Sequence, residues 1–290
     1  MKVSVITTVR NGAATLATCL ESVAFQLRRS PRGQEFEIEH VVVDGLSTDG
    51  SVELARAYPA TVRQLVSEPD RGIYDGMNKG LALATGEVAG FLNADDFFFR
   101  PDALGQVVDV FSGDTDTCYG QVLGVDPGRP ERIRRVWPAV PYRRSRFRFG
   151  WMPPHPTFFA RLEAYRRFGF LRLDLGSAAD YELMLRFLYR HRLSSRCVPD
   201  LWIAMRLGGV SNATFGNRLR SNSFDRKAWK VNGLDPFPGF RILKPARKVP
   251  QFWRRPSRLV ERDLVSFLHR TLSPSFPAVP GSGSAGQSSG

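Results

Sequence analysis

Apolar and polar positions alternate regularly through the first 112 residues. Short, nearly continuous apolar runs are separated by segments in which apolar side chains recur at helical spacing. The pattern predicts strands at 3–9, 38–44, 61–67 and 87–92, and helices at 13–27, 51–58, 73–84 and 102–111. Strands that are apolar throughout, with helices between them, indicate a parallel sheet covered on both faces.

The alternation weakens after residue 112. Residues 126–150 are rich in Pro and Arg and predict a loop or a basic excursion. The elements predicted beyond them are an apolar segment at 151–160, an amphipathic helix at 179–192, a strand at 201–211, a basic helix at 218–231 and a short amphipathic helix at 258–272.

Charge is divided unevenly along the chain. Residues 1–125 hold 10 Lys/Arg and 17 Asp/Glu, a net charge of −7, whereas residues 126–290 hold 31 and 11, a net charge of +20. A basic half of this size indicates an anionic partner, which is a nucleic acid, a membrane surface or a phosphorylated substrate.

The cysteines and the N-terminus indicate a cytoplasmic protein. Cys19, Cys118 and Cys197 are scattered and form no CxxC or Cys/His cluster, so neither a disulfide framework nor a structural zinc site is indicated. The apolar run at the N-terminus is too short for a signal peptide. No apolar run reaches about 18 residues, so we expect no transmembrane helix.

Polar residues follow each of the four predicted strands. They are Arg10 and Asn11 after the first, Asp44 at the end of the second, Glu68, Asp70 and Arg71 after the third, and Asn93, Asp95 and Asp96 after the fourth. Ligands bind beyond the carboxyl ends of parallel strands. We therefore expect these residues to share one edge of the sheet and to form a polar site.

Asp95 and Asp96 are adjacent acids followed directly by three phenylalanines. Neighbouring carboxylates near apolar surface require a cation or hydrogen bonds. A turn or helix cap before Pro101 is one explanation. Asn93 and the place at a strand's carboxyl end favour another, a Mg²⁺ or Mn²⁺ site that also bridges substrate phosphates.

Two further patterns indicate no site. The stretch from Gly281 to Gly286 reads GxGxxG, but no strand precedes it and it lies in a Gly/Ser-rich tail. His40 alternates into a predicted strand and is expected to be a packed or rim histidine.

Several ordered motifs resemble the family 2 glycosyltransferases, which have a GT-A fold. They are VSVITTVRNGAATLATCLESV, VVVDGLSTDGS and SEPDRGIYDGMNKGLALATGEVAGFLNADDFF, then MPPHPTFF, SAADYELMLRF and GGVS. The resemblance covers about residues 1–112 and returns in places as far as about residue 211. It implies an α/β GT-A fold with a mostly parallel central sheet and helices on both faces, and the residues beyond it add a basic helical C-terminal extension.

The resemblance also implies donor and metal ligands. The donor-binding residues implied are Thr8, Arg10, Asn11, Asp44, Asp70, Arg71, Asn78, Lys79, Asn93 and Asp95. Arg10 stands where an aromatic residue is usual, and its guanidinium could stack on a base instead. Asn93 replaces the first acid of the DxD motif, so a Mg²⁺ or Mn²⁺ cofactor would rest on Asp95 and Asp96, with Asp96 as the main ligand.

On the acceptor side the resemblance implies a carboxylate at the start of a helix. Asp180 is the candidate general base, and a helix N-terminus stabilises an anion there; the alternative is a helix cap. His155 resembles the acceptor-side histidine of the family, with a buried loop histidine as the alternative. Gly208 and Gly209 would let the chain pass close to substrate or to another backbone segment.

The resulting domain prediction has three parts. Residues 1–215 form the GT-A domain, with a nucleotide-sugar-binding part at 1–112 and an acceptor and catalytic part at 113–215. Residues 216–272 form the basic helical extension, and 273–290 form a disordered tail.

The predicted reaction is inverting transfer of a sugar from a UDP-, GDP- or dTDP-sugar to an acceptor hydroxyl. The acceptor expected is a lipid-linked or other saccharide in cell-surface polysaccharide or glycolipid synthesis. Phe252 and Trp253, among arginines, predict peripheral docking on an anionic membrane, at the inner face of the plasma membrane.

Two other classes stay open. A metal-dependent nucleotidyltransferase would require a Gly-rich, Lys/Arg-bearing loop after the first strand. The residues at that position are VRNGAAT, which argues against this class. A nucleic-acid-binding protein could use the basic half, but that half shows no helix-turn-helix, finger or RNP-like sequence, so we expect no nucleic-acid partner.

Overall fold

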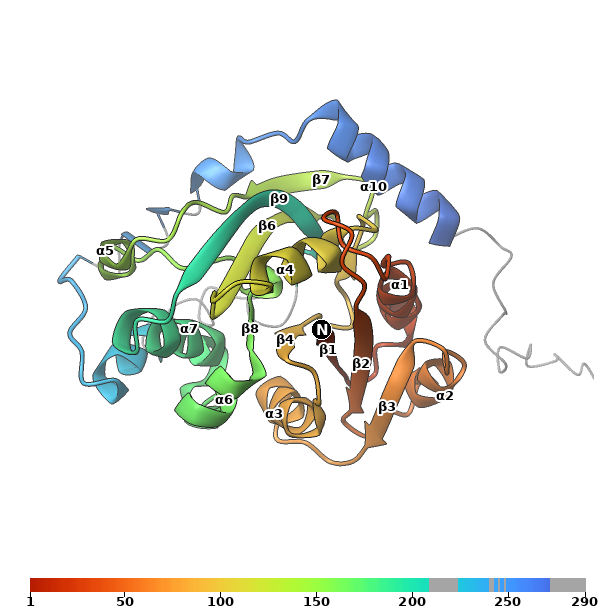
Figure 1. The fold of residues 1–290 in the computed structure, drawn as a ribbon, viewed down its shortest axis with the longest axis horizontal. Coiled ribbons are helices and arrows are strands. Elements are labelled where there is room, and N and C mark those ends of the chain that lie inside the picture. The colour runs from red at the N-terminus through yellow and green to blue at the C-terminus, as the bar shows by residue number, and fades with distance from the viewer. Residues whose placement is uncertain (209–223, 240–242, 245, 248, 272–290) are drawn as a thin grey trace, which may run out of the picture.

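The computed structural model describes residues 1–208, 224–239, 243, 244, 246, 247 and 249–271. One nine-stranded sheet runs through the described residues in the order β3-β2-β1-β4-β8-β6-β9-β5, with β7 paired to β6. Figure 1 shows the sheet curling from β3 on the right to β9 and β7 at the top, with α1 and α2 outside the right-hand strands.

The first half has the architecture predicted from the alternation. Its strands are β1 (Lys2–Val9), β2 (Glu37–Asp44), β3 (Val62–Ser67) and β4 (Val88–Phe91), and its helices are α1 (Ala13–Ala24), α2 (Ser51–Arg56), α3 (Ile73–Leu83) and α4 (Ala103–Phe111). β1 pairs in parallel with β2 and β4, and β2 with β3. All eight predicted elements are confirmed. Seven of the eight residues in β1 and in β2 are buried, as their unbroken apolar runs require.

Five further strands complete the sheet. They are β5 (Phe97–Phe98), β6 (Thr117–Val125), β7 (Ile133–Trp137), β8 (Phe159–Arg161) and β9 (Ser195–Arg206). β9 covers the predicted strand at 201–211 over residues 201–206, whereas the other four strands were not predicted. β9 runs parallel to β6, whereas β8 is antiparallel to β4 and β5 is antiparallel to β9. The prediction of a loop at 126–150 was wrong in part, because this region contains β7 and the short helix α5 (Arg144–Arg148).

The second half contains α-helices, 3₁₀ helices and one π-helix. The α-helices and 3₁₀ helices are α6 (Leu162–Phe168), α7 (Ala179–Met184), α10 (Arg258–Thr271), an α-helical stretch at 224–231, η1 (His155–Thr157), η2 (Leu173–Ala178) and η5 (Val249–Phe252). The predicted helix at 179–192 is present, but it continues from α7 as a π-helix, η3, over Leu185–Arg190. The predicted helix at 258–272 is also confirmed.

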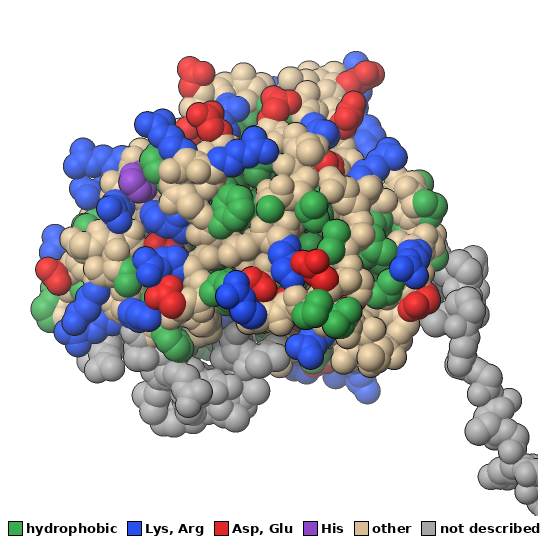
Figure 2. Space-filling view, turned by 90° about the horizontal axis from the view of Figure 1, so that it is seen from below, with side chains coloured by type: hydrophobic (Ala, Val, Ile, Leu, Met, Phe, Trp, Pro, Cys, Tyr) green, Lys and Arg blue, Asp and Glu red, His purple; other side chains and the backbone are tan. Residues whose placement is uncertain are grey.

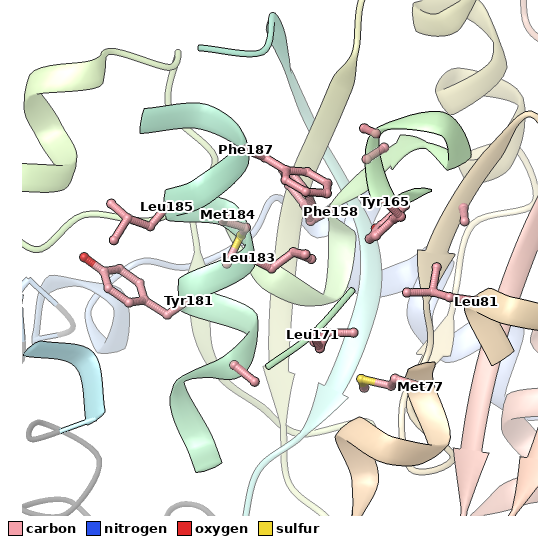
Figure 3. Packing of buried hydrophobic residues seen from close by; sticks show 14 of the residues in the cluster. Met77, Leu81, Phe158, Tyr165, Leu171, Tyr181, Leu183, Met184, Leu185 and Phe187 are labelled. Atoms are coloured by element: carbon pink, nitrogen blue, oxygen red, sulfur yellow. The ribbon is translucent and has the colours of Figure 1, made fainter. Parts of the chain in front are cut away.

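The largest core cluster anchors α7. Leu183 and Phe187 point toward Phe158 and Tyr165 (Figure 3), and Met184 belongs to the same cluster. Residues 224–231 join the same cluster, since Ala228 and Trp229 are fully buried in it. The described part of the predicted extension is thus packed into the domain, while the domain boundaries themselves stay a prediction.

Among the described residues, no helix is both long and apolar enough to cross a membrane. On the face seen in Figure 2, Lys and Arg side chains gather toward the left, the side on which Figure 1 places α6 and α7.

Candidate active site

The carboxyl ends of the parallel strands meet at one edge of the sheet, as predicted. Val9, the last residue of β1, lies opposite Asp44, and Asp44 lies opposite Ser67 at the end of β3. On the other side of β1, Ile6 pairs with Phe91, so the chain after β4 continues beside Thr8. The sheet therefore brings Thr8, Asp44 and Asn93 to the same edge.

Three oxygen atoms at this edge are buried without a hydrogen-bond partner. They are Thr8 Oγ1, Asp44 Oδ1 and Asn93 Oδ1. The other carboxylate oxygen of Asp44 is occupied, because Oδ2 accepts hydrogen bonds from the Ser47 backbone N–H (3.0 Å) and the Ser67 hydroxyl (2.6 Å). Buried polar atoms in proteins are nearly always paired, so three unpaired oxygens on neighbouring strands indicate a missing polar ligand.

Arg10 and Asn11 begin the loop after β1. Arg10 is exposed. Asn11 adopts a left-handed backbone conformation (φ 50°), and its Oδ1 accepts a hydrogen bond from the Thr48 backbone N–H at 2.9 Å. Asn11 thus holds this loop against the loop after β2, and its predicted donor contact stays a prediction.

The Asp70-Arg71-Gly72 segment lies against the end of β2. A Cβ atom on Gly45 would collide with the Asp70 carboxylate, so Asp70 reaches the same edge as Asp44. Arg71 is mostly exposed and pairs with Asp75 at 3.0 Å. That leaves the guanidinium accessible from solvent beside the strand ends.

Asn78 and Lys79 have partners within the protein. The Asn78 amide donates to the Leu171 carbonyl and accepts from the Leu171 N–H, both at 2.9 Å. Lys79 Nζ lies 2.8 Å from Glu68 and donates to the Pro69 carbonyl at 2.5 Å. These contacts give both residues a structural role, and their predicted donor contacts stay predictions.

Arg206 is the positive group beside the adjacent acids Asp95 and Asp96. Its backbone N–H donates to Asp96 Oδ1 (3.2 Å), and its guanidinium donates to the Asp95 carbonyl (2.6 Å) and lies 5.0 Å from the Phe97 ring centre. It reaches this position because β5, directly after the acids, pairs with β9. Arg206 therefore supplies at least part of the positive charge that the adjacent acids Asp95 and Asp96 need.

Burial dominates the protonation of the two acids. Asp96 is 1% exposed, and burial, followed by repulsion from Asp95, raises its pKa well above the ordinary value. The pKa of Asp95 is also raised by burial, with Arg206 acting in the opposite direction. Both oxygens of Asp96 are engaged, since Oδ2 accepts from the Asn93 amide at 3.2 Å.

This geometry fits a divalent cation at Asp95 better than at Asp96. Asp95 is only partly buried, and the unpaired Asn93 Oδ1 comes from the same short segment. Two hard oxygen donors suit Mg²⁺ or Mn²⁺ when substrate phosphates and water complete the shell. Within the described residues no group of three His, Cys, Asp or Glu side chains could hold a metal alone.

Asp180 lies in the first turn of α7 with His155 beside it. Its Oδ2 is 3.4 Å from His155 Nδ1, and its Oδ1 accepts the Tyr181 backbone N–H at 2.8 Å. Tyr74 lies near this carboxylate, and burial followed by the charge of Asp180 raises the pKa of Tyr74 well above its usual value. Asp180 and His155 keep 22% and 34% of their side-chain surface exposed, so both can meet a substrate.

Other predicted residues are placed as follows. Gly208 has a φ of 118°, a conformation that favours glycine, whereas Gly209 lies outside the described residues. His40 is fully buried, and its Nε2 lies 2.9 Å from Thr7 Oγ1. The prediction of a packed histidine is thus confirmed.

Three residues near the site were not predicted. Arg206 balances the acids, Tyr74 lies near Asp180, and Trp137 stands edge-on to His155 with ring centres 5.6 Å apart. Of these three residues, only Arg206 could have been found from the sequence. It directly follows the apolar run LWIAM, and a charged residue at such a position suggests a buried ion pair.

Comparison with known proteins identifies the family. The model named "Glycosyl transferase family 2" matches residues 4–171. The chain belongs to this family. A "PGL/p-HBAD biosynthesis glycosyltransferase" of Mycobacterium bovis is 39% identical over 277 residues, covering 92% of this chain and 97% of the relative. An uncharacterized glycosyltransferase of Mycobacterium tuberculosis is 32% identical over 263 residues, covering 89% and 95%.

Two solved structures have a similar fold. TarS of S. aureus (residues 1–349) superimposes with a TM-score of 0.60 at 19% identity, covering 95% of this chain and 73% of TarS. The mannosyltransferase PcManGT of Pyrobaculum calidifontis, in complex with GDP-Man and Mn²⁺, gives 0.57 at 19% identity, covering 96% and 76%. The predicted GT-A fold is therefore confirmed.

Proposed function

We propose that this glycosyltransferase moves a sugar from a nucleotide-sugar donor to an acceptor hydroxyl with inversion at the anomeric carbon. The observation that carries the proposal is the set of three unpaired, buried oxygens of Thr8, Asp44 and Asn93 at the strand ends. The Thr8 and Asp44 oxygens suit the N–H and O–H groups of a base and a ribose, and the Asn93 oxygen suits a cation that binds the diphosphate. The solved relatives with UDP-GlcNAc and with GDP-Man support a donor of this class.

Asp180 is the proposed general base. The acceptor O–H bond breaks as its proton passes to the Asp180 carboxylate, and the oxygen forms a bond to the anomeric carbon. The nucleoside diphosphate leaves from the opposite face with the electron pair of the broken bond. The Tyr181 N–H and His155 fix the orientation of the carboxylate before the acceptor arrives.

The diphosphate needs positive charge as it departs. Asp95 and Asn93 Oδ1 would hold a Mg²⁺ or Mn²⁺ ion, whose chemistry is to neutralise charge on the leaving phosphates. Arg71, mostly exposed beside the strand ends, adds a second positive group from the chain itself. Asp96 is buried and fully bonded, so we assign it to holding Asn93 and β9 in place.

A lipid-linked acceptor is supported by the 39% identical relative, whose name places it in PGL/p-HBAD biosynthesis. The metal-dependent nucleotidyltransferase is the weaker alternative, because the chain matches the glycosyltransferase family over residues 4–171.

A donor-binding screen tests the proposal. Wild type, Asp95→Asn and Asp96→Asn are titrated with UDP-, GDP- and dTDP-sugars, with and without Mn²⁺, while binding heat and released nucleotide are recorded. We expect one donor to bind with Mn²⁺, Asp95→Asn to lose the metal-dependent part, and Asp96→Asn to lose mainly stability. Glu87→Gln, at an exposed position, is the matched control. Absence of binding to every nucleotide-sugar, in a folded protein, would overturn the proposal.

A further inference from the structure

A group of exposed apolar and basic side chains surrounds the end of η5 and the start of α10. We call it the basic-aromatic surface and define it as Phe252, Trp253, Arg254, Arg255, Arg258 and Leu259. Trp253 is 77% exposed, Leu259 55% and Phe252 50%. Large apolar side chains are seldom this exposed together, and such clusters mark interaction sites.

Neighbouring elements fix this surface in place. The Arg135 guanidinium of β7 lies 5.8 Å from the Phe252 ring centre and 5.7 Å from that of Trp137. Gln251 is buried, and α10 buries Leu264, Phe267 and Leu268 against the sheet. In Figure 1 the chain passes beside β7 and then enters α10 along the upper right edge. The exposed rings therefore project from a packed support.

The charge around the basic-aromatic surface is mainly positive. Residues 243–262 contain seven Lys/Arg and one acid, and residues 129–148, which include β7, contain eight Arg and one acid. Arg254 and Arg255 are both exposed, and they line a groove together with Leu201 and with Asp200, whose carboxylate pairs with Arg100 at 3.3 Å. An anionic partner is favoured at this location.

We infer that the basic-aromatic surface docks the protein on an anionic lipid bilayer. Trp and Phe side chains partition into the headgroup region, while arginines contact lipid phosphates. Leu259 favours a bilayer over a nucleic acid as the partner. An aliphatic side chain cannot stack on bases, but it is stabilised by contact with acyl chains. The one patch thus presents the three types of side chain that an anionic interface accommodates.

The inference deepens the proposed function and depends on it only for the acceptor. Phe267 of α10 stacks on Phe97 with ring centres 5.4 Å apart, and Phe97 directly follows Asp96. The lipid-binding segment is therefore joined by side-chain packing to the strand end that carries the acidic pair. A lipid-linked acceptor would reach an enzyme already held at the bilayer.

Vesicle binding by the full chain tests the inference without any substrate. The probes are phosphatidylglycerol–phosphatidylcholine vesicles and pure phosphatidylcholine vesicles, with cosedimentation and tryptophan emission as readouts. All five tryptophans lie in the described residues, and Trp253 is the exposed one. We expect binding to the anionic vesicles with a blue shift in emission, and weaker binding at about 500 mM salt than at about 50 mM because screening shortens the range of the charges.

Two variants separate the two parts of the surface. Arg254→Gln/Arg255→Gln should weaken binding about 30-fold at low salt. Phe252→Ser/Trp253→Ser should weaken it about tenfold at either salt and abolish the blue shift. The matched control is Arg166→Gln/Arg167→Gln, which removes an adjacent pair of exposed arginines from α6 and should bind as wild type does.

Several outcomes would overturn the inference. One is absence of binding to anionic vesicles by folded wild type, and another is equal binding by the wild type and the Phe252→Ser/Trp253→Ser variant. Binding to single-stranded nucleic acid without binding to vesicles would assign the surface to that partner instead. Nucleotide-sugar titration of the same variants keeps the two proposals distinct, since docking can fail while donor binding persists.

Discussion

The two acidic centres of this protein differ in how their charge is compensated. Asp95 and Asp96 adjoin a buried arginine, and Asp96 has both oxygens bonded within the protein. Asp180 stays partly exposed and has a helix N-terminus, a histidine and a tyrosine around it. A carboxylate that must exchange a proton with substrate needs access, whereas a buried one mainly organises its neighbours.

The comparison shows that adjacent acids after a strand do not all have one role. The first acid of the pair, Asp95, remains partly accessible and suits a cation, while the second, Asp96, ties β5 to β9 through Arg206. Four substitutions test the roles assigned to the two acidic centres and to the strand-end oxygens. They are ordered from the largest expected effect to the smallest.

Asp180→Asn should lower the rate of nucleotide release about 10³-fold, because the general base is lost. Donor affinity, measured by calorimetry, should stay unchanged, since the donor oxygens lie at the strand ends. Glu163→Gln, an exposed neighbour on α6, is the control and should behave as wild type. A rate loss below about threefold would remove Asp180 from the proton transfer.

Arg206→Gln should lower the free energy of unfolding by about 3 kcal/mol, because the buried acids lose their counter-charge. Urea denaturation measures the change. Arg100→Gln is the control, since Arg100 pairs with Asp102 and Asp200 at a more exposed location and should cost about 1 kcal/mol or less. Equal losses in the two variants would mean that Arg206 does not compensate the acids.

Asp44→Asn should weaken nucleotide-sugar binding about tenfold, because an amide N–H₂ would replace an acceptor oxygen facing the ligand. Titration calorimetry gives the affinity. Asp49→Asn changes an exposed acid that accepts the Ala13 N–H at 2.9 Å, and it should affect stability rather than affinity. Unchanged affinity in Asp44→Asn would exclude Asp44 Oδ1 from the donor site.

Asp96→Asn should change how stability depends on pH. Burial and Asp95 raise the Asp96 pKa above its ordinary value of 3.8, so the folded protein holds this proton more tightly than the unfolded chain does. The associated stability is present below pH 3.8 and is lost as the pH rises through the folded pKa. Urea titrations in the presence of EDTA measure the free energy of unfolding at each pH. The decrease in this free energy with rising pH should be absent in Asp96→Asn and present in Asp180→Asn. Its persistence in both would contradict the buried assignment of Asp96.

The first half of the fold was predictable because its pattern is local. Each strand of 1–112 is an apolar run followed by a helix, and parallel pairing then places the strand ends together. This rule predicted that Asp44 lies at the edge of the sheet that binds the ligand, and the family resemblance added Thr8 to the same edge.

The second half depended on partners far along the chain. β6 and β9 pair across about 80 residues, and β7 is a short, arginine-bearing strand that is recognisable only beside β6. Arg206 acquires its role from the β5–β9 register, which no local pattern contains. The partition of duties between Asp95 and Asp96 likewise depends on burial, so the sequence predicted Asp96 as the main ligand where the geometry favours Asp95.

Helix α7 contacts residues that are made much later in translation. Tyr181 accepts a hydrogen bond from Trp229, 48 residues on, and the Asn232 amide donates to buried Glu182, 50 residues on. The Lys244–Asp225 ion pair closes over Tyr181, with Nζ 3.6 Å from its ring centre. A nascent chain halted at residue 215 would hold every predicted site residue and still lack these partners. The packing around α7 is therefore completed only after residues 225–244 have been synthesised.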